Sequence, residues 1–158
     1  MVEVGNCIHH IFASIEEHQA NINTYIRDII RSFGLETVLS DHDSIITAWK
    51  NLTSHLATTY GVAVHTWHER PFRMERDGQT IVGSIDLVWQ TTKGDLLIDY
   101  KTCPMGESAI TNPASEHFVG IYGGQISTYR DALEAAGEHV LKCIVYYPVS
   151  GLITELVL

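Results

Sequence analysis

The sequence predicts an α/β fold in which a mixed central sheet is flanked by helices and preceded by an N-terminal helical segment. Three observations predict it: helical spacing of apolar residues in the first part of the chain, strand-like apolar runs in the middle, and a second helical pattern followed by two more such runs. A chain of 158 residues has the size of one domain, so we expect a single domain over residues 1–158.

Helices are expected first. Residues 5–19 place apolar side chains on one helical face, and residues 21–33 form a second such segment, which Gly34 ends as a C-cap. Ser40 is the N-cap candidate of a third helix, which should end near residues 60–61.

Strand-like segments follow. Residues 62–67 alternate or run apolar, as sheet strands do. Residues 73–76 and 80–82 flank Asp77-Gly78, which is a strong short-range signal for a hairpin.

Two further strands are predicted at residues 83–88 and 97–102. The polar, glycine-containing residues 90–95 between them indicate a turn. Antiparallel pairing of these strands brings Asp86 and Asp99 close together.

The last part of the chain begins with an irregular stretch, residues 102–117, which is either a substrate-contacting loop or an ordinary connection. Residues 118–136 then predict a helix that Gly137 ends. Residues 140–147 and 152–158 predict a closing hairpin.

The two aspartates and the nearby Lys101 suggest chemistry. Neighbouring carboxylates raise each other's pKa unless a cation lies between them, and oxygen ligands of this kind favour Mg²⁺ or Mn²⁺. Side chains alternate along a strand, so Lys101 lies on the same face as Asp99 while Tyr100 points to the other. Such a site suits hydrolysis of a phosphodiester bond.

The Asp86…Asp99-Tyr100-Lys101 arrangement resembles the PD-(D/E)XK nuclease superfamily, and its surroundings resemble the RecB-type exonuclease domain, the C-terminal domain of bacterial helicase-nucleases. Four other segments match in order: residues 5–9 (Gly-x-x-x-His), 69–72 (Glu-x-Pro-Phe), 83–88 (Gly-x-Ile-Asp-Leu-Val) and 125–129 (Gln-x-x-x-Tyr). Each motif alone is weak, but five in the same order are a specific signal. The resemblance implies a restriction-endonuclease-like fold.

The resemblance also implies roles for single residues. His9, Asp86, Asp99 and the backbone carbonyl of Tyr100 are expected to hold Mg²⁺ or Mn²⁺. Lys101 is expected to act in catalysis with Asp86 and Asp99, by orienting or activating the attacking water.

Three residues are expected to support this site. Glu69 is either an outer carboxylate or the start of a strand. Gln125 and Tyr129 lie one helical turn apart and would position a DNA phosphate or the catalytic lysine, unless Tyr129 only packs in the core. His10 is an alternative to His9 as the metal-ligating histidine. A histidine on a helix is also more often a packed or surface residue than a ligand.

Composition limits the function classes. The net charge of −9 is unusual for an autonomous DNA-binding domain and implies weak DNA affinity. Arg70, Arg73 and Arg76 lie close in sequence and form either a solvated hairpin or a phosphate-contacting rim. No apolar run approaches the ~20 residues of a membrane span, and the first residues do not resemble a signal peptide. We therefore expect no membrane association and a cytoplasmic location.

Cysteine usage also agrees with a cytoplasmic location. The 3 cysteines show no C-x-x-C spacing. Some relatives in the RecB-type branch hold an iron-sulfur cluster with four cysteines. Three cysteines cannot supply four ligands, so we expect no iron-sulfur cluster in this protein.

The resemblance implies a metal-dependent DNA nuclease, an exonuclease acting in DNA repair or recombination. Its expected partners are DNA and a helicase domain or subunit, since the chain has no P-loop of its own. It would be either a module of a helicase-nuclease, which its acidity favours, or a stand-alone phage or plasmid homologue. Two alternatives remain: a non-catalytic nuclease-fold scaffolding module, and a metal-dependent hydrolase of a small phosphorylated substrate.

Overall fold

The computed structural model describes residues 2–102 and 116–157. Its main helices are α1 (Val2–Ser14), α2 (Ile22–Ser32), α3 (His42–Tyr60) and α5 (Glu116–Ala135). Its strands are β1 (His65–Arg76), β2 (Gln79–Thr91), β3 (Gly94–Tyr100), β4 (Val140–Tyr147) and β5 (Leu152–Leu156). Among the described residues, no helix is both long and apolar enough to span a membrane.

The strands form one sheet in the order β1-β2-β3-β4-β5. Strands β1, β2 and β3 pair antiparallel, as do β4 and β5, whereas β3 and β4 run parallel. A parallel pair needs a crossover connection, and α5 lies in the chain between these two strands. The predicted α/β fold with a mixed sheet flanked by helices is confirmed.

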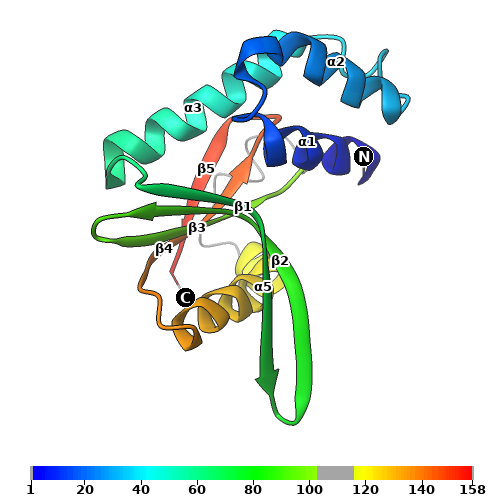
Figure 1. Ribbon diagram of the computed structural model, residues 1–158. Coiled ribbons are helices and arrows are strands. Elements are labelled where there is room, and N and C mark those ends of the chain that lie inside the picture. Colours follow the sequence, from blue (N-terminus) through cyan, green and yellow to red (C-terminus); the bar gives the residue numbers. More distant parts are fainter. Residues whose placement is uncertain (1, 103–115, 158) are drawn as a thin grey trace.

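The sheet separates two hydrophobic cores. The larger core lies between the sheet and α1, α2 and α3, and the smaller lies between the sheet and α5 (Figure 1). Strand β3 contributes to both in turn: Ile98 and Tyr100 belong to the larger core and Leu97 to the smaller. Tyr100 therefore points away from the face that carries Asp99 and Lys101, as the alternation of side chains predicts.

Strands β1 and β2 are longer than predicted. Their pairing runs from Arg76↔Gln79 at the tip to His65↔Gln90, so the short predicted segments merge into one long hairpin. Pro71 does not interrupt β1, because β1 is an edge strand and a proline there costs no sheet hydrogen bond. This hairpin extends beyond the rest of the sheet (Figure 1).

The turn between β2 and β3 is shorter than residues 90–95. Gln90 and Asp95 already pair in the sheet, which leaves Thr92 and Lys93 as the turn. The hairpin itself was predicted correctly.

The helices differ from the prediction mainly at their ends. The first begins at Val2 and ends at Ser14. The third is capped by Asp41, not by Ser40, because the Asp41 carboxylate accepts a hydrogen bond from the backbone N–H of Ser44 at 3.1 Å. Gly34 has a positive φ of 66°, which suits the predicted helix stop.

The later elements are found where they were expected. Helix α5 and the hairpin of β4 and β5 are present, and Gly137 after α5 has a positive φ of 87°. The irregular stretch predicted at residues 102–117 lies almost wholly outside the described residues.

Candidate metal centre

Hairpin geometry brings the two aspartates together. The last recorded pair of β2 and β3 is Leu87↔Ile98, and one step further in the same antiparallel register Asp86 lies opposite Asp99. The Asp86 carboxylate is fixed in place, because its Oδ2 accepts a hydrogen bond from the backbone N–H of Tyr100 at 2.6 Å.

His9 reaches the same point from α1. Its Nε2 lies 3.0 Å from the Tyr100 carbonyl oxygen, and its Nδ1 lies 3.4 Å from Asp86 Oδ1. Burial lowers the pKa of His9, but the hydrogen bond to Asp86, the charge of that carboxylate and the Tyr100 carbonyl outweigh burial and leave the pKa raised.

Gly5 explains how α1 comes so close. A Cβ at Gly5 would lie 2.5 Å from Oγ1 of Thr102, which is closer than a Cβ approaches other heavy atoms. The glycine of the Gly-x-x-x-His segment thus lets α1 pass directly over the end of β3. His9, one helical turn further on, is then level with the Tyr100 carbonyl.

Glu69 joins this group from β1. His9, Glu69 and Asp86 each offer a ligand atom, and these atoms lie within 4.8 Å of one another. The recorded pairing of β1 with β2 passes from His68↔Leu87 to Arg70↔Ile85 and omits Glu69, whose φ of +46° is uncommon for a residue with a side chain. Ser84 donates a hydrogen bond to Glu69 Oε2 at 3.0 Å and helps to orient the carboxylate.

Lys101 forms an ion pair with the buried Asp99 beside the group. Lys101 Nζ lies 2.8 Å from Asp99 Oδ2, and Asp99 is 2% exposed. The pKa of Asp99 is raised to about 6: burial and then the charge of Asp86 raise it, while Lys101 and His9 lower it.

Helix α5 holds the lysine from its other side. Lys101 Nζ donates a hydrogen bond to Gln125 Oε1 at 3.1 Å, and the ammonium lies 5.0 Å from the centre of the Tyr122 ring. Gln125 Nε2 in turn donates to the Tyr129 hydroxyl. The Tyr129 ring packs edge-on against Phe72, with ring centres 5.2 Å apart, so a contact chain links Lys101 to β1.

The donor set fits a divalent metal ion. Neighbouring ligands of an octahedral ion at about 2.0–2.1 Å lie about 3 Å apart, which is the spacing between His9 Nε2 and the Tyr100 oxygen. Imidazole, carboxylate and carbonyl ligands together are compatible with Mg²⁺ or Mn²⁺. The strained backbone at Glu69 is a further feature typical of functional sites.

The structure therefore places every predicted site residue in one region. His9, Asp86 and the Tyr100 carbonyl meet directly, Asp99 pairs with Lys101, and Gln125 and Tyr129 share one face of α5. Glu69, expected as an outer carboxylate, lies in the ligand group of the described residues, whereas Asp99 does not.

A signal for Glu69 was present in the sequence. In a hairpin closed by a tight turn at Asp77-Gly78, each step away from the turn on one strand matches one step on the other, which places Arg70 opposite Ile85. One more step places Glu69 opposite Asp86. The predicted hairpin, residues 73–76 and 80–82, ended short of both residues.

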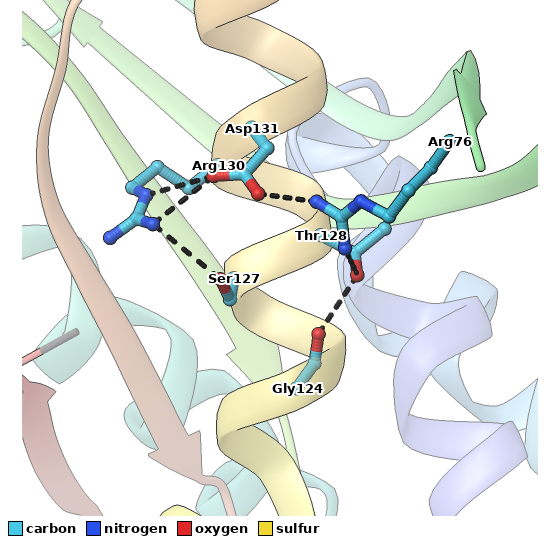
Figure 2. Close-up of polar contacts among 6 residues, drawn as sticks. All are labelled: Arg76, Gly124, Ser127, Thr128, Arg130 and Asp131. Atoms are coloured by element: carbon cyan, nitrogen blue, oxygen red, sulfur yellow. Dashed lines mark hydrogen bonds and ion pairs between the residues drawn. The ribbon is translucent and has the colours of Figure 1, made fainter.

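The arginines of the hairpin have acidic partners within the protein. Arg70 pairs with Glu138, and Arg73 lies 3.4 Å from Glu75. Arg76 pairs with Asp131 on α5 and contacts the Thr128 hydroxyl (Figure 2). These contacts argue against a phosphate-contacting rim for Arg70 and Arg76, whereas Arg73 is largely exposed, as the solvated-hairpin alternative expects.

Comparisons with known proteins add the family. No curated protein matches the chain. A solved structure titled "Crystal structure of SSO0001" is similar at 15% sequence identity and a TM-score of 0.37, over 96% of this chain and 64% of that chain. This chain thus spans less than two thirds of that structure's length.

The sequence profile of the PD-(D/E)XK nuclease superfamily matches residues 2–153. Members of this superfamily are usually nucleases that use divalent metal ions. The match covers strands β1 to β4, the start of β5 and every residue of the candidate metal centre. The chain therefore belongs to the PD-(D/E)XK nuclease superfamily.

Proposed function

We propose that this protein is a metal-dependent DNA nuclease of the RecB type, an exonuclease that hydrolyses phosphodiester bonds. One observation carries the proposal: the ion pair of Lys101 with the buried Asp99, with 2.8 Å between Nζ and Oδ2, lies beside the ligand group of His9, Glu69 and Asp86. A purely structural device would not need three carboxylates and a cation gathered from three neighbouring strands.

The ligands divide into two sets. His9, Glu69 and Asp86 supply closely spaced donor atoms, and the Tyr100 carbonyl and Asp99 add oxygens from β3. Mg²⁺ or Mn²⁺ held there would polarise a phosphoryl oxygen and lower the pKa of a bound water.

Lys101 has a separate task in this proposal. Asp99 on one side and Gln125 on the other hold its ammonium group. From there Lys101 orients the attacking water and stabilises negative charge that develops on the phosphoryl oxygens. Tyr129 acts through Gln125 and keeps the amide in position.

The net negative charge supports a separate DNA-binding partner. The net charge is −9, and the three hairpin arginines are neutralised by carboxylates. Weak DNA affinity follows, because phosphate contacts supply most non-specific binding. We propose that a helicase domain or subunit provides the grip on DNA in repair or recombination, which also makes the cytoplasm the expected compartment.

A second candidate, a metal-dependent hydrolase of a small phosphorylated substrate, is favoured by the same acidity. One assay separates the two functions. Linear DNA and a phosphomonoester are each incubated with the purified protein and Mg²⁺, Mn²⁺ or EDTA. We expect metal-dependent loss of DNA, slow and strongest at low salt, and no hydrolysis of the phosphomonoester.

Variants link the activity to the site. Asp86→Ala and Asp99→Ala should abolish both DNA hydrolysis and Mn²⁺ binding, whereas Asp28→Ala, at an exposed position on α2, should change neither. Unchanged Mn²⁺ affinity in both site variants would refute this metal centre. Intact metal binding with no DNA hydrolysis at high protein concentration would refute the nuclease function of the isolated chain.

A further inference from the structure

A pocket lies beside the candidate metal centre, between the long hairpin and α5. It is open to solvent and has a volume of about 260 Å³. The hairpin contributes Phe72, Val82 and Gly83 to its lining, and α5 contributes Gln125, Thr128 and Tyr129. Pockets for drug-sized ligands measure about 300–1,000 Å³, so this pocket suits a single planar ring system.

The pocket shares two residues with the site. Gln125 and Tyr129 are the residues that hold Lys101 from α5. Phe72 follows Glu69 on β1, and Gly83 precedes Asp86 on β2, where the two strands pair Phe72 with Gly83. A group bound in the pocket therefore lies next to the groups assigned to hydrolysis.

Its surface is aromatic with a few polar groups. The Phe72 ring packs closely over Gly83, since a Cβ there would lie 2.8 Å from the ring, and it meets Tyr129 edge-on. Among the described residues, Tyr129 uses one of the two N–H donors of the Gln125 amide. An aromatic surface with an adjacent amide and a hydroxyl is the chemistry that binds a nucleobase, by stacking and by hydrogen bonds to its edge.

Electrostatics favour a base over a phosphate at this place. Arg76 contacts Thr128 in the pocket lining and is paired with Asp131 (Figure 2). The Thr128 hydroxyl also donates to the Gly124 carbonyl at 2.9 Å. Because this cation is neutralised, the pocket attracts the phosphates of a DNA strand only weakly. The uncharged base is then the part of the strand that the pocket can bind.

We propose that this pocket binds one unpaired nucleobase of the DNA strand being cleaved, and so restricts hydrolysis to single strands and frayed ends. The proposal rests on the proposed nuclease function. A base within a duplex is stacked on both faces and paired at its edge, so it enters such a pocket only after it has been unpaired.

An abasic scan tests the proposal. Single-stranded oligonucleotides carry one abasic nucleotide at successive positions, and the cleaved bonds are mapped in Mn²⁺. We expect an abasic nucleotide at one fixed distance from a bond to slow cleavage of that bond about tenfold, in line with the worth of one stacked base. A flat scan in an active enzyme would overturn the pocket and leave the nuclease function intact.

A matched pair of variants ties the effect to the pocket. Val82→Phe fills it from a position that is 68% exposed, and Val149→Phe makes the same change at a position that is 64% exposed in the turn between β4 and β5. Val82→Phe should cleave normal oligonucleotides about tenfold more slowly and show no further abasic effect. Val149→Phe should retain both the native rate and the native scan. An unchanged scan in folded Val82→Phe protein would also overturn the proposal.

Two further readouts keep the pocket and the nuclease function distinguishable. Bis(4-nitrophenyl) phosphate has no base, so Val82→Phe should hydrolyse it at the native rate. Oligonucleotides with 2-aminopurine report base binding by fluorescence in EDTA, without hydrolysis. A change in fluorescence at one position that Val82→Phe removes would support the pocket even in a protein that cleaves nothing, and its absence at every position would overturn it.

Discussion

Lys101 is held at the candidate metal centre by Asp99: Nζ lies 2.8 Å from Oδ2, and the aspartate is 2% exposed. Both side chains leave the same face of β3 at its end, two positions apart, which is how the Asp-x-Lys spacing produces this contact. The pair therefore serves two functions, because the lysine partly neutralises a buried carboxylate and is itself oriented.

Replacement of the lysine separates chemistry from binding. Lys101→Ala should lower the rate of DNA hydrolysis about 10²–10³-fold, the loss typical of one deleted electrostatic stabiliser. Mn²⁺ affinity should hold or rise, because a positive charge next to a cation site is removed. Single-turnover cleavage and Mn²⁺ titration measure the two effects on the same sample.

Lys142→Ala is the matched control, since Lys142 is a half-exposed lysine that pairs with Glu155 on the far strand β5. It should leave both quantities unchanged. A stable, metal-bound and fully active Lys101→Ala protein would rule out the role proposed for the lysine.

Asp99 should destabilise the metal-free protein. Its pKa is about 6 in the fold against 3.8 for the free side chain. Between about pH 4 and pH 6 the unfolded chain loses this proton before the folded protein does, so the free energy of unfolding falls as pH rises through that window and stays lowered above it. At neutral pH, Asp99→Asn should therefore raise the free energy of unfolding in EDTA by roughly 1–3 kcal/mol.

Urea denaturation measures that change, with Asp28→Asn on the surface of α2 as the control. Added Mn²⁺ should stabilise the native protein and leave Asp99→Asn unaffected. A destabilised Asp99→Asn protein would mean that the ion pair with Lys101 outweighs the burial of the carboxylate.

Metal binding should depend on pH in the opposite direction. Ligands must lose their protons before they bind an ion. The raised pKa of Asp99, about 6, and the raised pKa of His9 predict that Mn²⁺ affinity falls as pH drops through about 6. Calorimetric titration between about pH 5 and pH 8 measures this, and a flat profile across that range would contradict the ligand assignment.

Gly5 should be essential to the position of His9. Gly5→Ala places a methyl group 2.5 Å from Thr102 Oγ1, so either α1 or the Thr102 side chain has to move, and we expect the helix to shift away from the end of β3. We expect at least tenfold weaker Mn²⁺ binding in a folded protein, about 1.4 kcal/mol. Gly124→Ala on α5, where an added Cβ meets nothing within 4 Å, is the matched control and should bind Mn²⁺ like the native protein.

Glu69 distinguishes a metal ligand from an outer carboxylate. Glu69→Gln keeps the size of the side chain and removes its charge, so a ligand role predicts weaker Mn²⁺ binding and slower hydrolysis. Glu75→Gln, at an exposed position on the same strand, controls for the loss of charge. Equal Mn²⁺ affinity in the two variants would return Glu69 to a purely supporting role.

Local patterns predicted most of this fold because its turns are local signals. The polar residues between β2 and β3 predicted the hairpin, and with it the approach of Asp86 to Asp99. Sequence patterns were less informative where tertiary context overrides local preference. Pro71 is tolerated within β1 only because that strand lies at the edge of the sheet, which the sequence does not reveal.

The ion-pair partners of the hairpin arginines are a second feature that the sequence did not predict. Arg70 and Arg76 find Glu138 and Asp131, residues far along the chain, and no spacing rule connects them. The helix cap is a smaller example: Ser40 and Asp41 are both good caps, and the hydrogen bond to Ser44 decides between them.

The candidate centre draws on distant parts of the chain, since His9 comes from α1, Glu69 and Asp86 from the long hairpin, and Gln125 from α5. During synthesis a ribosome therefore makes the histidine long before the glutamine that orients the lysine. Until α5 has emerged and docked, the nascent chain has no complete site. The candidate site therefore becomes complete only when the whole domain has folded, after translation has passed α5.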